Sequence, residues 1–139
     1  MRLLGSCTLA LGLLAAAHAL AAGPASASAS QNAAAETHLQ RIAEPRRTIT
    51  VQNGVIYPWN HPGQVIEIYG PISDSDVLVL LAQAKYHAGG VYRITGDSQY
   101  AALRFDCKDC EIKYDRVYRK ADKGWVYLYE KGVIPRPAP

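Results

Sequence analysis

The stretch Tyr100–Glu130, YAALRFDCKDCEIKYDRVYRKADKGWVYLYE, decides the fold of this chain. Aromatic and β-branched residues surround two turn sequences, Lys108-Asp109 and Ala121–Gly124, a pattern typical of three antiparallel strands. With Lys108-Asp109 as a two-residue loop, Phe105 lies opposite Ile112 and an apolar ladder forms on one face. The stretch therefore predicts the C-terminal half of an antiparallel sheet.

Cys107 and Cys110 flank the first turn, and three interpretations of this pair stay open. The Cα atoms at the two ends of a β-turn lie less than about 7 Å apart, so a disulfide can bridge them. A redox-active pair needs its first cysteine at a helix N-terminus, whereas strand-like residues surround both cysteines here. A zinc site would have to recruit His61 and His87, which show no paired spacing. We predict a structural disulfide, with no metal and no cofactor.

The motif Cys107-Lys-Asp-Cys110 resembles the cysteine-bracketed loop, Cys-Lys-Pro-His-Asp-Cys, of the bacterial periplasmic inhibitors of vertebrate-type lysozyme. Those are small exported proteins built on a sheet with helices, and their loop plugs the enzyme cleft. The resemblance covers only these four residues. The Pro-His insert with the inhibitory histidine is absent, so no functional residue is carried over.

The last hairpin carries most of the candidate binding residues. Strict alternation predicts that one face holds Ile112, Tyr114, Tyr118, Val126 and Leu128. It predicts that the other face holds Val117, Arg119, Trp125, Tyr127 and Tyr129. Since Tyr, Trp and Arg dominate interface energetics, the second set is the candidate partner-binding surface. The alternative is a second core layer covered by residues 33–47.

The N-terminus reads as a secretory signal peptide over residues 1–21. Met1-Arg2 is a short basic region, Leu3–Leu14 is apolar, and Ala19–Ala21 offers a cleavage site. Cys7 lies in a lipobox-like sequence, but the apolar run follows it instead of preceding it, which argues against a lipid anchor. We expect a periplasmic or secreted protein in an oxidising compartment, with no transmembrane span in the mature chain.

Residues 22–47 and 134–139 flank the predicted domain. The first segment is rich in Ser and Ala and lacks aromatic residues, so we expect a flexible arm. Within it, residues 33–43 can form a helix when docked. The second segment is a proline-rich tail.

Residues 48–133 are predicted to form a single α+β domain. Asn53-Gly54 indicates a type I′ hairpin, and a third strand covers residues 64–69. One main helix starts at Ser73 or Asp74 and stops at Gly89-Gly90. The expected order is β-β-β-α-β-β-β-β: a mostly antiparallel sheet of about seven short strands, with the helix packed on one face. Whether the strands before and after the helix pair in parallel is left open.

Composition and motifs favour binding over chemistry. The 15 Lys and Arg against 12 Asp and Glu give a net charge of +3 without a basic cluster, so no nucleic-acid partner is expected. None of the common catalytic motifs is present, so no catalytic residue is assigned and the protein is not predicted to be an enzyme. The expected partner is another protein, with an oligomer left open. We favour an inhibitor or immunity-type antagonist of a secreted enzyme. The alternatives are a structural component of an envelope or secretion assembly, and a CxxC thiol–disulfide or metal-dependent enzyme.

Overall fold

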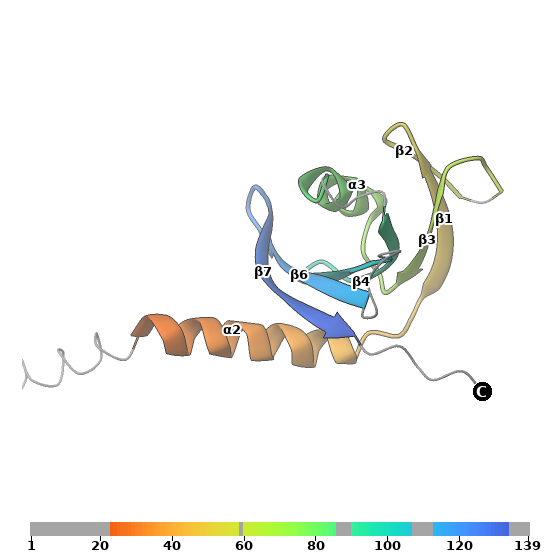
Figure 1. Ribbon diagram of the computed structural model, residues 1–139. Helices are drawn as coiled ribbons and strands as arrows, with labels where there is room; N and C mark the ends of the chain where they lie inside the picture. Colours follow the sequence, from red (N-terminus) through yellow and green to blue (C-terminus); the bar gives the residue numbers. More distant parts are fainter. Residues whose placement is uncertain (1–22, 59, 86–89, 107–112, 134–139) are drawn as a thin grey trace, which may run out of the picture. The chain divides into compact units, whose positions relative to one another are not determined.

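The computed structural model describes residues 23–58, 60–85, 90–106 and 113–133 (Figure 1). The chain divides into two compact units, Met1–Ala33 and Ala34–Pro139, and the sheet belongs to the second. The predicted signal peptide, the Cys107/Cys110 pair, His87 and the proline-rich tail lie outside the described residues.

Seven strands form one sheet in the order β2-β1-β3-β4-β5-β6-β7. The strands are β1 (Arg46–Gln52), β2 (Val55–Tyr57), β3 (Gln64–Tyr69), β4 (Val91–Gly96), β5 (Tyr100–Phe105), β6 (Lys113–Ala121) and β7 (Gly124–Val133). Every neighbouring pair is antiparallel except β3 and β4, which run parallel. The predicted mostly antiparallel α+β fold is therefore confirmed. The two strands before and after the helix, whose pairing the sequence does not determine, pair in parallel.

The β1–β2 hairpin is closed by the Asn53-Gly54 turn that the sequence predicts. Asn53 and Gly54 have φ values of 52° and 73°, and Gln52 pairs with Val55 across the two-residue loop. Positive φ at both loop residues is the requirement of a type I′ turn, which Asn-Gly meets with little strain.

Helix α3 (Asp74–Gln83) lies over one face of the curved sheet (Figure 1). It begins where the Ser73 hydroxyl accepts a hydrogen bond from the Asp76 backbone N–H, at 3.1 Å. Its apolar residues Val77, Leu80 and Leu81 are buried against the sheet. The core that they join consists of Ile49, Ile66, Ile68, Ile72, Ala84, Val91, Ile94, Ala101, Leu103, Phe105, Tyr118 and Trp125.

Helix α2 (Gly23–Gln40) adds a second helix to the one main helix that was expected, and its end lies within residues 33–43, where a docked helix was predicted. Its last residues, from Ala34 on, belong to the same unit as the sheet, and Ala35 is completely buried. His38 Nε2 lies 2.5 Å from Asp97 Oδ2, and Lys131 Nζ lies 2.5 Å from Glu36 Oε1. These tertiary contacts supply the stabilisation that an isolated short helix lacks in water.

Candidate partner-binding site

The β6–β7 hairpin divides the five predicted binding residues between the two faces of the sheet. Val117 pairs with Tyr129, whereas the next residue, Tyr118, pairs with Tyr127. Leu128 is therefore an extra residue in β7, a β-bulge that shifts the alternation by one position. As a result Tyr127 lies on the α3 face, and Tyr129 lies on the opposite face.

Trp125 is part of the core. Its exposed fraction is 4%, and its indole Nε1 donates a hydrogen bond to Asp76 Oδ1 at 3.3 Å. Its backbone is also covered, because the Gln83 side chain bonds to both its N–H and its C=O, at 3.1 and 2.7 Å. A residue enclosed in this way cannot contact a partner directly, so the core alternative describes Trp125.

Val117, Arg119 and Tyr129 lie on the face opposite α3. Val117 is buried, and Tyr129 lines a pocket together with Leu39 of α2. Arg119 pairs across the strands with Tyr100 and lines a different pocket at the end of the sheet, of about 700 Å³. The predicted surface of five residues is therefore not one surface, and part of it is the second layer formed with residues 33–47.

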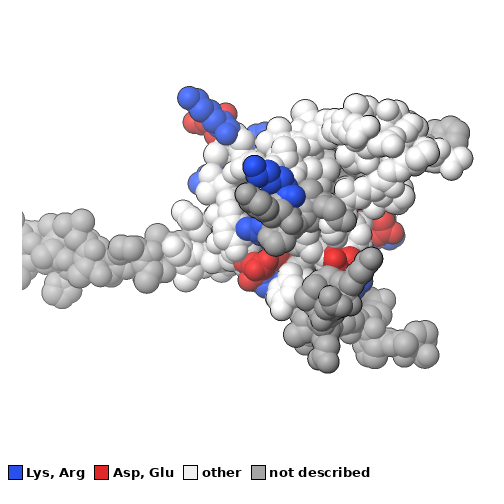
Figure 2. Space-filling view, turned by 45° about the horizontal axis from the view of Figure 1, so that its top comes forward, with Lys and Arg blue, Asp and Glu red and all other residues white. Residues whose placement is uncertain are grey.

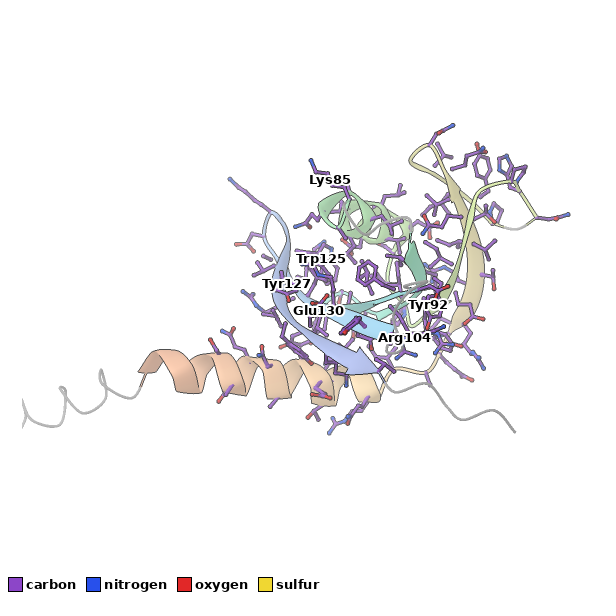
Figure 3. All side chains as sticks on the ribbon, viewed as in Figure 1. Lys85, Tyr92, Arg104, Trp125, Tyr127 and Glu130 are labelled. Carbon is purple, nitrogen blue, oxygen red and sulfur yellow. The ribbon has the colours of Figure 1, made fainter. Side chains whose placement is uncertain are left out.

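Tyr127 stays accessible, and the bulge gives it neighbours that strict alternation does not predict. Its exposed fraction is 46%. The Arg116 guanidinium carbon lies 4.6 Å from the centre of its ring, and the Tyr118 ring packs edge-on with centroids 5.9 Å apart. Glu130 faces Arg116 across the strands, with Nε and Oε1 4.0 Å apart. Figure 3 shows Trp125, Tyr127 and Glu130 along β7, with Trp125 nearest to α3.

We call Tyr114, Arg116, Tyr127 and Glu130 the β6–β7 patch. Tyr114 pairs with Phe105 and lies on the same face, which corrects the predicted pairing of Phe105 with Ile112, and its exposed fraction is 39%. Arg116 makes no hydrogen bond to any residue that the structure describes, and its Nε is buried. The patch thus presents aromatic surface and a stacked guanidinium whose terminal nitrogens make no hydrogen bond to a described residue, a combination that is frequent at protein interfaces.

The patch has a rigid support. Burial alone would raise the pKa of Asp76, but hydrogen bonds from Lys120, Trp125 and Ser73 outweigh burial and lower it. The ionised Asp76 side chain joins α3 to both strands of the hairpin, because it contacts Lys120 of β6 and Trp125 of β7. The hairpin that carries the patch is therefore fastened to α3, and an anchored hairpin loses less entropy on binding than a free one.

No three His, Cys, Asp or Glu side chains of the described residues form a group that could hold a metal ion. His61 stacks on Tyr57 with ring centroids 3.5 Å apart and an angle of 2° between the ring planes, and its Nδ1 lies 2.8 Å from the Pro62 carbonyl.

On the face shown in Figure 2, cationic and acidic side chains lie beside one another.

Comparisons of the chain with protein-family models, with curated proteins and with solved structures gave no match. Neither helix in the described part of the chain combines the length and the apolar character needed to cross a membrane.

Proposed function

We propose that this protein is exported to the periplasm or beyond and acts there without catalysis, by binding another protein through the β6–β7 patch. The observation that carries the proposal is the exposed Tyr127 ring, which has the Arg116 guanidinium on its face and packs edge-on against the buried Tyr118. Tyr and Arg on rigid supports are the residues that most often dominate binding energy.

The chemistry of the patch defines the partner surface that would fit it. Arg116 Nε is buried, but the side chain is 23% exposed, so the partner should bring a carboxylate or backbone carbonyl groups to the terminal nitrogens of the guanidinium. Tyr127 and Tyr114 offer exposed aromatic area, so the partner should cover them with apolar side chains. Glu130 is held only loosely by Arg116 and can accept a donor from the partner.

An inhibitor or immunity-type antagonist of a secreted enzyme is the form of this function that we favour. It predicts a soluble one-to-one complex. A structural component of an envelope or secretion assembly uses the same surface, but it predicts co-fractionation with membranes or a ring or filament.

Site-specific photo-cross-linking tests the proposal. A photoreactive amino acid at position 127 should capture one protein from envelope extract, and the Arg116→Gln change should abolish that product. The matched control position is Val65, which is more exposed than Tyr127 but lies on β3. Equal capture from positions 127 and 65, or capture at position 127 that persists with Arg116→Gln, would contradict the proposal.

A further inference from the structure

A second site lies on the face of the sheet opposite α3. It is a pocket of about 180 Å³ between the last turns of α2 and strands β4 to β7. Its floor is one cross-strand row, in which Thr95 pairs with Ala102, Ala102 with Val117, and Val117 with Tyr129. The small side chain of Ala102 leaves the hollow near the middle of this row.

The charged groups that line the pocket are paired with one another. Arg104 donates two hydrogen bonds to Asp115, from Nε at 2.8 Å and from Nη2 at 3.1 Å. Lys131 binds Glu36 of α2 at 2.5 Å. A charged ligand would have to break one of these pairs and leave a half-buried charge alone, which is costly.

The neutral polar groups of the pocket are unused. The side chains of Thr95, Gln40 and Tyr129 make no hydrogen bond to any part of the chain that the structure describes, although all three line the pocket. Burial raises the pKa of the Tyr129 phenol, and the carboxylates of Glu36 and Asp115 raise it further. The Tyr129 hydroxyl therefore stays protonated and can donate a hydrogen bond to a ligand.

The size and the walls restrict the ligand further. The volume is below the roughly 300 Å³ of the smallest drug-sized sites, so the pocket holds a single small ring. Leu39, Ala102 and Val117 provide apolar wall and floor between the polar groups. A ring with apolar C–H faces and a rim of hydroxyl groups matches this mixture.

We propose that this pocket binds a neutral polyhydroxylated ligand of the size of one monosaccharide, held by Thr95, Tyr129 and Gln40 over Ala102 and Val117. The site lies on the other face of the sheet from the β6–β7 patch, so it does not depend on the function proposed above.

An NMR titration of the whole mature protein tests this site. Glucose, N-acetylglucosamine and myo-inositol are the neutral probes, and glucuronate is the charged control. The neutral probes should give saturable shifts at the Thr95 and Tyr129 amides, with a Kd on the order of 1 mM for at least one of them. Glucuronate should bind more weakly than glucose.

Two variants make the test specific. Tyr129→Phe removes an unbonded hydroxyl, so it should weaken binding about three- to tenfold without lowering the melting temperature. Ala102→Val fills the hollow and should abolish the shifts, whereas the control Tyr57→Phe should bind as the unmodified protein does. Shifts with none of the neutral probes would mean that the pocket holds only water and would overturn the proposal. Unchanged affinity in Tyr129→Phe would overturn it as well.

Discussion

At the scale of single residues, Leu128 determines which aromatic side chains face solvent. It is the extra residue of the β7 bulge, and it places Tyr127 beside Tyr118 and Arg116 instead of beside Tyr129. The sequence WVYLYE has no glycine and no polar break to indicate a bulge. Strict alternation therefore predicts Trp125 and Tyr127 on the same face as Val117 and Tyr129, and the observed pairing shows that this grouping is wrong.

Trp125 and Tyr127 form a natural pair for mutation. Trp125→Ala should lower the free energy of unfolding by about 3–5 kcal/mol, because it leaves a cavity beneath α3 and removes a hydrogen bond to Asp76. Tyr127→Ala is the control on the same strand and should cost about 1 kcal/mol or less, because its ring is half exposed. Urea denaturation measures both changes. Equal costs for the two variants would show that the bulge does not separate them.

The ionisation of Asp76 makes the folding stability depend on pH. Hydrogen bonds from Lys120, Trp125 and Ser73 outweigh burial and lower its pKa below the ordinary 3.8. As the pH falls, Asp76 is therefore protonated in the unfolded state before it is protonated in the folded state. The contribution of its carboxylate to stability is complete above pH 3.8. It is lost as the pH falls through the lower folded-state pKa.

Asp76→Asn should therefore destabilise the protein at pH 7, by about 1–3 kcal/mol, and the difference from the unmodified protein should shrink below pH 3.8. Thermal unfolding followed from pH 7 down to pH 2 measures this. A difference that stays constant over the whole range would show that the carboxylate charge has no role.

At the scale of elements, the sequence predicts turns, caps and single strands better than it predicts how the elements pair and pack. The Asn53-Gly54 turn, the Ser73 cap and the alternation of β3 act locally, and each is visible in a few residues. The parallel pairing of β3 with β4 depends on where α3 packs, which is a tertiary property. The same holds for α2, whose docking depends on partners as distant in the sequence as Asp97 and Lys131.

The open edge of β7 is protected by α3. β7 is the last strand of the sheet and has ten residues, and the Gln83 amide makes the two hydrogen bonds to Trp125 that a further strand would make. The bulge at Leu128 interrupts the edge further along, and bulges also hinder edge-to-edge pairing.

Gln83→Ala should thus leave two backbone groups of Trp125 without partners. The expected cost is about 1–3 kcal/mol in the free energy of unfolding, together with a greater tendency to self-associate. Gln99→Ala is the control, because its side chain makes no hydrogen bond to any described residue. Light scattering and urea denaturation measure both effects. A fully soluble Gln83→Ala variant of unchanged stability would contradict this explanation.

At the scale of the whole molecule, the two faces of the sheet have different coverings and, we propose, different uses. α3 covers the apolar face, except around the β6–β7 patch. The end of α2 covers part of the other face, over the row from Thr95 to Tyr129. The sequence indicates one main helix and a second helix, residues 33–43, that forms only when it is docked, because an isolated helix of that length is marginal in water.

Two truncations separate the halves of α2. Removal of residues 1–33 should leave the stability of the sheet unit unchanged, because the unit begins at Ala34. Removal of residues 1–40 should lower the melting temperature by several degrees, because Ala35 and Leu39 and the ion pairs of Glu36 and His38 are lost. Equal melting temperatures for the two truncated proteins would show that α2 does not stabilise the sheet.

The most direct measurement concerns the partner that cross-links at position 127. Calorimetric titration of that partner with the Tyr127→Ala variant should show a loss of about 2 kcal/mol of binding free energy, roughly thirtyfold in Kd, while the variant stays folded at the temperature of the titration. Arg116→Lys, which keeps the charge but not the planar fork, should also weaken binding. Full affinity in both variants would contradict a binding role for the β6–β7 patch.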